Sequence, residues 1–166
     1  MAMIHQLSAL FIAALLAGCG AGTAEVECPV DEAAPPPELA YTKTLDGVAS
    51  MDEALAKVEE SLEAQGFGIV TRMDFQKTMK AKLDKDMRPY HVLGACHAPS
   101  AFQALQHDDR AGLLLPCKVA VYEKEDGSIA VSFARPGASF SLLADPGAAP
   151  LAETVDASIR AAFDSL

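Results

Sequence analysis

Residues 113–134 read LLLPCKVAVYEKEDGSIAVSFA. Two runs of alternating apolar and polar residues flank the segment Lys124-Glu125-Asp126-Gly127. An Asp-Gly pair between two such runs is a strong short-range signal for a β-hairpin. The stretch therefore predicts two antiparallel strands, over 113–123 and 128–134, which the remaining elements of the chain have to join.

The elements on the N-terminal side of this hairpin alternate between strand and helix patterns. Ser50 and Glu53 form a capping box ahead of a helix expected over 51–65, and Gly66 supplies its stop. We further expect an edge strand over 40–47, a strand over 67–75 with Phe67, Ile69, Thr71, Met73 and Phe75 on one buried side, a lysine-rich helix over 76–85 that buries Met79 and Leu83, and a strand over 88–96.

The C-terminal elements complete the pattern. Pro99 suits the first turn of a short helix over 99–106, with Phe102 and Leu105 expected to point inward. A long amphipathic helix follows over 149–165. The order predicts an α+β fold in which a mostly antiparallel sheet carries its helices on one face. The core positions expected on the two long helices are Leu55, Val58 and Leu62 on the first and Leu151, Val155, Ile159, Ala162 and Phe163 on the last.

The first residues have the pattern of an export signal. An apolar run over 7–17, broken by one serine, is too short to cross a bilayer and has the length of a signal-peptide core. It leads into LAGC at 16–19, which resembles the lipobox of bacterial lipoproteins, although no Lys or Arg precedes the run. We expect a signal peptide over 1–18 and lipid on Cys19, with Gly20 favouring the outer membrane of the cell envelope and a domain that faces the periplasm. An uncleaved anchor helix is the alternative.

Charge separates a tether from the domain. Residues 19–38 are rich in Gly, Ala and Pro and contain five of the 23 acidic side chains, which predicts an extended acidic tether. The domain expected over 39–166 carries the other 18 acidic residues and all 13 basic ones. Its negative balance argues against nucleic acid as a partner. Six basic residues lie close together and predict a solvated helix face: Arg72, Lys77, Lys80, Lys82, Lys85 and Arg88.

Three stretches of the domain carry specific motifs. They read GFGIVTRMDFQKTMKAKL at 66–83, RPYHVLGACHAPSAFQAL at 88–105 and AGLLLPCKVAVYEKEDGSIAVSF at 111–133. They resemble the bacterial and archaeal family named for the domain of unknown function 302 (DUF302), with the best match over 67–133 and with His97-Ala98 in place of the family's Asn-Pro. The resemblance implies a compact fold similar to the TATA-binding-protein-like β-α-β-β-β-β-α architecture, and often a homodimer. It implies no established activity.

Cys96 and Cys117 are the candidate functional residues, together with His97. Alternate side chains of a strand point to opposite faces, so Cys96 has the parity of Val92 and Cys117 has the parity of Val119. We expect both sulfurs close together on the core side near one end of the sheet, and His97 on the other side. Three interpretations stay open: buried core thiols, a redox or disulfide pair suited to an exported protein, and a soft-metal site for Cu(I).

The remaining motifs do not identify a reaction or a cofactor. The sequence has no glycine-rich phosphate loop, no GxSxG and no HExxH. It also has no CxxCH for covalent haem and no paired CxxC for zinc, so neither of these metal sites is predicted. We expect a lipid-tethered binding or interaction module of the cell envelope, with its site near 94–99 and 113–117. The alternative is a thiol-redox or copper-binding protein that uses Cys96 and Cys117. Cys28, in the tether, has no assigned partner.

Overall fold

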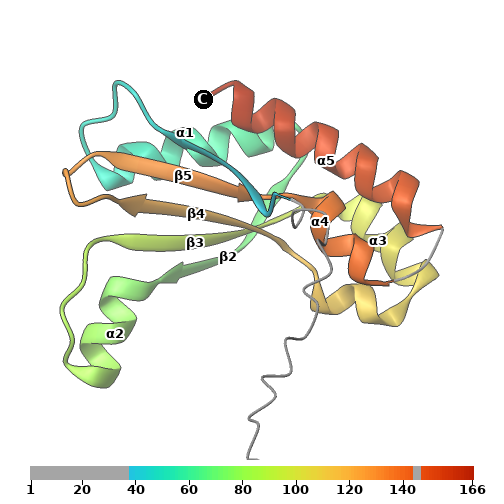
Figure 1. Cartoon of the computed structure of the whole chain (residues 1–166), viewed down its shortest axis with the longest axis horizontal. Helices are drawn as coiled ribbons and strands as arrows, with labels where there is room; N and C mark the ends of the chain where they lie inside the picture. Colours follow the sequence, from blue (N-terminus) through green and yellow to red (C-terminus); the bar gives the residue numbers. More distant parts are fainter. Residues whose placement is uncertain (1–37, 144–146) are drawn as a thin grey trace, which may run out of the picture. The chain divides into compact units, whose positions relative to one another are not determined.

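Five strands form one antiparallel sheet in the order β1-β5-β4-β3-β2 (Figure 1). The computed structural model describes residues 38–143 and 147–166. The expected signal peptide, the lipidation site Cys19, Cys28 and the tether as far as residue 37 lie outside these residues. The strands are β1 (Ala40–Thr44), β2 (Gly68–Asp74), β3 (Tyr90–Cys96), β4 (Cys117–Glu123) and β5 (Ile129–Ala134).

The hairpin predicted from residues 113–134 is formed by β4 and β5, which pair from Glu123 opposite Ile129 to Val119 opposite Phe133. β4 begins later than expected, because a 3-10 helix, η1 (Asp109–Leu113), precedes it. β1 pairs with β5 at one edge of the sheet, as predicted.

Two long helices cover one face of the sheet (Figure 1). The Ser50 hydroxyl caps α1 (Met51–Glu63) by accepting the Glu53 N–H at 3.2 Å, and the Glu53 carboxylate accepts the Ala49 N–H at 2.8 Å. The predicted stripes of α1 and of α5 (Ala148–Asp164) are confirmed. The main core contains Val58, Leu62, Phe67, Leu93, Ala95, Val119, Val121, Val131, Phe133, Val155, Ile159, Ala162 and Phe163.

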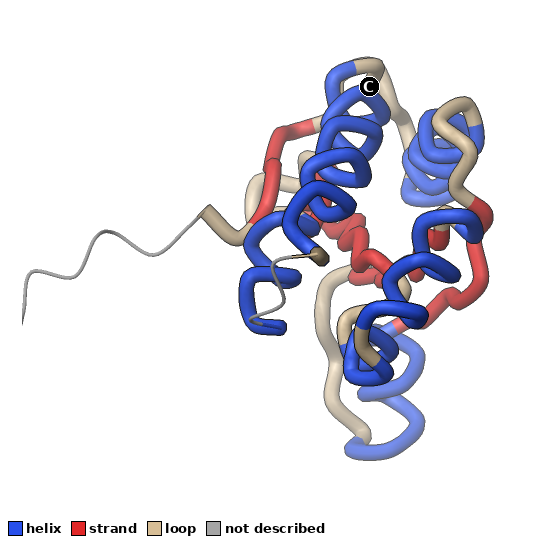
Figure 2. The backbone as a smooth tube through the Cα atoms, turned by 90° about the vertical axis from the view of Figure 1, so that its right-hand side faces the viewer, coloured by secondary structure: helices blue, strands red, loops and turns tan. Residues whose placement is uncertain are grey.

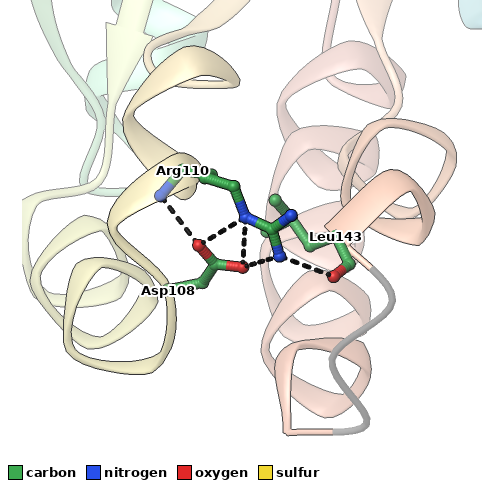
Figure 3. Close-up of polar contacts among 3 residues, drawn as sticks. All are labelled: Asp108, Arg110 and Leu143. Atoms are coloured by element: carbon green, nitrogen blue, oxygen red, sulfur yellow. Dashed lines mark hydrogen bonds and ion pairs between the residues drawn. The ribbon is translucent and has the colours of Figure 1, made fainter.

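A second, smaller core lies among the helices that follow β3 and β5. These are α3 (Ala98–His107), whose first turn contains Pro99 as predicted, α4 (Pro136–Phe140) and the 3-10 helix η2 (Ser141–Leu143). Figure 3 shows how Arg110 links η1 to η2: its guanidinium donates to Asp108 at 2.6 Å and to the Leu143 carbonyl at 3.4 Å. The buried residues of this core are Ala104, Ala111, Phe140, Leu143, Ala148 and Ala152.

Phe102 and Leu105 of α3 do not point inward, as the sequence analysis expected. They are 66% and 41% exposed, while Ser100 and Ala104 are buried. Small side chains let a helix approach its neighbours closely, and Ala104 belongs to the second core. The apolar spacing of α3 therefore pointed to the wrong face.

The predicted buried side of residues 67–75 is correct for one half of the strand. The pairing of β2 with β3 shifts between Ile69 and Thr71, and one extra residue in a strand reverses which face every later side chain occupies. Phe67 and Ile69 pack on the main core. Beyond the bulge, Thr71 and Met73 lie on the opposite face of the sheet, where Met73 is 50% exposed.

Helix α2 (Phe75–Leu83) leaves the end of β2 and lies away from α1 and α5; it is the lowest helix in both views (Figure 1, Figure 2). None of its residues is buried. Leu83 is 62% exposed and Met79 is partly exposed, so the prediction that this helix buries both was wrong. Within the described residues, its main contact is with β3.

The fold is α+β, as the element order predicted. When the short helices α2, α3 and α4 are left out, the order is β-α-β-β-β-β-α, which is the order that the family resemblance implies. None of the described helices has the length and apolar character needed to cross a bilayer.

Candidate functional site

The two cysteine-bearing motifs meet at a small enclosed cavity at the end of the sheet. Its volume is about 10 Å³, which is room for one water molecule. Pockets that bind small molecules measure about 300–1,000 Å³, so this cavity does not hold a substrate in its present form. The lining includes Phe67, Cys96, His97, Ser100, Leu115 and Cys117.

Cys117 faces the main core, as its parity predicted. It packs at the border of the core that contains Val119 and Val121. Burial, followed by the electrostatic effect of the nearby Cys96, raises the pKa of the Cys117 thiol to about 11. At neutral pH only about one molecule in 10⁴ then carries the thiolate, which is the nucleophilic and metal-binding form. This environment favours a packing role for Cys117.

Cys96 has the opposite strand parity from the one expected, although it lines the same cavity as Cys117. Ala95, not Cys96, lies opposite Cys117 in the β3–β4 pair. Because side chains alternate, Ala95 shares the core face with Cys117 and Cys96 belongs to the other face. Cys96 reaches the cavity because it is the last residue of β3, where the chain leaves the sheet for α3. Both thiols are free.

His97 lies on the core side, where the sequence analysis had placed Cys96. Its ring packs against Phe67 at 5.6 Å between centroids, and its Nδ1 is 2.8 Å from the Ser100 hydroxyl. Gly66, at a φ of 81°, lies so close that an added Cβ would be 3.3 Å from the ring. His97 therefore closes the loop between α1 and β2 against the start of α3, which is a structural role.

Gly94 explains why the motifs LGAC and LLPC occur together. A Cβ at Gly94 would lie 2.5 Å from Cγ of Pro116 and 2.3 Å from Oγ1 of Thr71. The proline follows the cis peptide bond Leu115–Pro116 and fills the space that the glycine leaves on β3. These motifs thus fit three neighbouring strands together.

The geometry argues against a metal site at these residues. Within 38–143 and 147–166, no group of three or more His, Cys, Asp or Glu side chains could hold a metal ion. Nδ1 of His97 lies 2.8 Å from the Ser100 hydroxyl, and Cys117 packs against the main core. A structural role fits all three residues.

The other face of the sheet is a second candidate site, which the sequence analysis did not identify. α1 and α5 pack on the face that carries Val119 and Phe133. The strand registers place a different set on the opposite face, which we call the uncovered face. Lys118 is its one charged residue. The uncovered face consists of Ala40, Thr42, Thr44, Thr71, Met73, Tyr90, Val92, Gly94, Cys96, Lys118, Ala120, Tyr122, Ala130, Ser132 and Ala134.

A row of contacts crosses this face from α2 to β1. Phe75 of α2 meets Tyr90 edge-on at 5.8 Å, and Tyr90 stacks on Tyr122 at 5.4 Å between ring centroids. The hydroxyl of Tyr122 lies 3.4 Å from that of Ser132, which in turn lies 2.8 Å from that of Thr42. The side chains in this row are aromatic or carry hydroxyl groups, and none of them is charged. The sequence could have indicated this face, because every second residue is uncharged along the paired parts of β1, β3 and β5 and along the second half of β2.

The fold and these motifs define an α+β protein built on an antiparallel sheet with one helix-covered face. A comparison with known protein families matches residues 41–166 to the family described as "Domain of unknown function DUF302". The chain belongs to this family, and the match extends beyond the stretch 67–133 that carried the resemblance.

Among solved structures, the chain is similar to an uncharacterised conserved DUF302 protein from Bacillus stearothermophilus, with 25% sequence identity and a TM-score of 0.69. That similarity covers 76% of this chain and 96% of the other chain. A search of the curated proteins found no match.

Proposed function

We propose that this protein is a lipid-tethered interaction module of the cell envelope, and that its uncovered face binds a second copy of the same chain. The observation that carries the proposal is the composition of this face: Lys118 is its one charged residue, in a chain with a net charge of −10. Charged groups are depleted at the centres of protein interfaces, whereas tyrosine is enriched there.

A second copy fits this face better than a charged partner does. Two chains of net charge −10 repel each other unless they meet through a surface of low charge. The uncovered face provides such a surface, and a twofold axis would place the same side chains of both copies in contact. Tyr90 and Tyr122 supply large apolar rings with polar tips, which suit an interface that is exposed in the free chain.

The tether follows from the N-terminal sequence. The apolar run, LAGC at 16–19 and the acidic segment up to residue 38 have the order expected of a lipoprotein leader and spacer. Lipid on Cys19 would hold the domain at a membrane, where attachment to one surface raises the local concentration of the copies and favours their pairing.

The thiol-redox and copper alternatives are less well supported. Cys96 and Cys117 line the same small cavity, but their strand positions have opposite parity and both thiols are free. The pKa of about 11 for Cys117 disfavours its thiolate. The arrangement supports packing rather than chemistry at this end of the sheet.

The dimer is tested by placing a charge at the centre of the uncovered face. Ala120 lies on β4 between Val92 and Ser132, and Ala120→Glu would bring two like charges together at a twofold interface. Light scattering coupled to size-exclusion chromatography should give a dimer mass for the wild type and a monomer mass for Ala120→Glu. The control is Ala56→Glu on the exposed side of α1, which should remain a dimer. A monomeric wild type would refute this part of the proposal.

The anchor is tested separately by metabolic labelling with palmitate. Wild-type protein should incorporate the label and Cys19→Ala should not. Equal labelling of both proteins would show that Cys19 is not the lipidated residue, whatever the outcome of the mass measurement.

A further inference from the structure

Helix α2 has no buried residue, although Phe75 packs on Tyr90. The inference drawn from this helix rests on the proposed lipid anchor. We propose that the α2 arm, residues 75–88, is a second membrane contact and lies against the anionic headgroups of the bilayer that holds the lipid. The arm carries five basic and two acidic residues, a net charge of +3 in a chain of −10. Positive charge is thus concentrated in one short segment of an acidic protein.

The apolar residues of the arm run toward its free end. Phe75, Met79 and Leu83 are spaced four residues apart and therefore share one side of the helix. Phe75 packs on Tyr90, whereas Leu83 is 62% exposed and Met87, beyond the helix, is 36% exposed. A helix of a water-soluble domain normally buries its apolar side. The exposure of Leu83 and Met87 therefore suits contact with another apolar surface.

The arm holds a defined shape. Asp74 caps the helix by accepting the Lys77 N–H at 2.9 Å, and the Gln76 side chain donates to the Met87 carbonyl at 2.8 Å. Lys80 pairs with Asp84 at 2.8 Å and with Asp86 at 3.1 Å. These contacts fold the segment after the helix back against it, so that Leu83 and Met87 are presented from an ordered structure.

The charges favour an anionic lipid surface as the partner. Lys80 forms ion pairs with both acidic side chains of the arm, Asp84 and Asp86. Lys77, Lys82 and Lys85 form no ion pair with any residue in the described part of the chain. Long basic side chains around a small apolar patch are typical of segments that lie in the headgroup region, because their stems cover apolar surface while their charges reach phosphate.

The length of the tether allows this contact. The spacer from Cys19 to Glu38 has 20 residues and would span roughly 25 Å as a flexible coil, or about 65 Å when fully extended. A single lipid chain binds a membrane weakly and reversibly, and stable attachment commonly needs a second signal such as a basic patch. The arm would supply that signal.

A tryptophan probe tests the contact directly, because the chain contains no tryptophan. The full chain with Leu83→Trp is reconstituted in vesicles of phosphatidylcholine alone or with phosphatidylglycerol. The matched control is Leu113→Trp, at a residue of η1 that is 84% exposed. The emission of Leu83→Trp should shift to shorter wavelength in the anionic vesicles and return at high salt, while the control should show no lipid-dependent shift.

Neutralising Lys77, Lys82 and Lys85 to Gln should abolish the shift of Leu83→Trp. Each lysine near an anionic surface contributes about a fivefold factor to binding, so the three together should lower the contact equilibrium roughly a hundredfold. Palmitate labelling and dimer mass should stay unchanged in the lysine variant, so a failure here is distinct from a failure of the anchor or the dimer.

Three outcomes would overturn the membrane contact: the same emission in both kinds of vesicle, an equal shift at the control position, or a shift that depends on protein concentration without vesicles. The last result would assign the arm to the contact between two copies.

Discussion

The two faces of the sheet are made from the same five strands but have different side chains. On the covered face, Val119, Val121 and Phe133 are 0% exposed beneath α1 and α5. The uncovered face carries alanine, threonine, serine and tyrosine, with no long helix over it. The main hydrophobic core therefore lies on one face, and the other face is the one that we propose for binding.

The difference between the two faces shows that a sheet face can carry few charges without being buried under helices. A sheet face exposed to water usually alternates to charged or strongly polar residues. Here Lys118 is the one charged residue of the face, and ring stacking and hydroxyl contacts join neighbouring strands across it. These properties are the ones on which the proposed contact between two copies depends.

The largest expected effect comes from replacing one large side chain on each face by alanine and comparing the losses of stability. Phe163 packs between Tyr41 and Phe133, with ring centroids 5.7 Å away on both sides, and is 9% exposed. Phe163→Ala should lower the free energy of unfolding by about 3–5 kcal/mol. Tyr122→Ala, on the uncovered face, should cost about 1 kcal/mol through the lost stacking with Tyr90. Denaturant unfolding measures both, and equal losses would contradict the division between the faces.

The second test uses the pH dependence of Cys117 on the covered face. Its folded-state pKa of about 11 lies above the ordinary value of 9.0. As pH rises, the unfolded chain loses this proton first, so the stabilising contribution is complete below pH 9 and is lost as pH rises through about 11. The wild type should lose roughly 2–3 kcal/mol more than Cys117→Ala between these values.

Unfolding curves at pH 8 and pH 11 for both proteins give this difference. Cys96→Ala serves as the control, because Cys96 has the opposite parity, and it should keep most of the wild-type pH dependence. Identical slopes for the wild type and Cys117→Ala would show that Cys117 is not buried in the folded protein.

The third test concerns close packing on the uncovered face. Gly94→Ala would place a Cβ within 2.5 Å of both Pro116 and Thr71, and overpacking of this kind typically costs about 1–3 kcal/mol. Gly68→Ala on β2 is the matched control, because a Cβ there meets nothing within 4 Å. The midpoint of denaturation should fall for Gly94→Ala and stay nearly constant for Gly68→Ala. A shift of similar size in both would mean that strand flexibility, rather than the contact with Pro116, explains the glycine.

The smallest expected effect lies at the border of the covered face. Arg72 of β2 donates to both carboxylate oxygens of Glu59 on α1 at 2.8 Å, but the two side chains remain 59% and 23% exposed. Exposed ion pairs contribute about 0.2–1 kcal/mol. Arg72→Gln should therefore destabilise the domain by less than 1 kcal/mol at low salt, and by less at high salt. A larger loss would place this edge of the sheet in the main core.

The elements that could be predicted from sequence are those with a strong local period. The hairpin of β4 and β5 follows from alternation around Asp126-Gly127, and α5 follows from apolar residues at helical spacing. The capping residues of α1 were equally visible, because a cap is a contact between residues three or four positions apart. Short-range patterns of this kind are set by the backbone geometry of one element.

The candidate site could be located from sequence but not oriented. In β3, Tyr90 and Val92 on one parity are as apolar as Leu93 and Ala95 on the other. The alternation therefore does not say which set is buried, and the prediction placed Cys96 in the core and His97 outside. The structure gives Cys96 the opposite strand parity, although Cys96 still lines the cavity beside Cys117, and it packs His97 against Phe67. The exposed stripe of α2 was missed for a related reason, since apolar spacing does not reveal whether a second surface is present.

The sequence by itself determined the kinds and the order of the main strands and helices, because these depend on neighbours along the chain, but it did not predict the short helices η1, α4 and η2 or the later start of β4. The tertiary structure alone decided which face of each strand is buried. That choice depends on strand pairing and on the bulge between Ile69 and Thr71, which reverses the parity of β2 halfway along. A one-residue change in register moves every later side chain to the opposite face, and contacts between distant segments set that register.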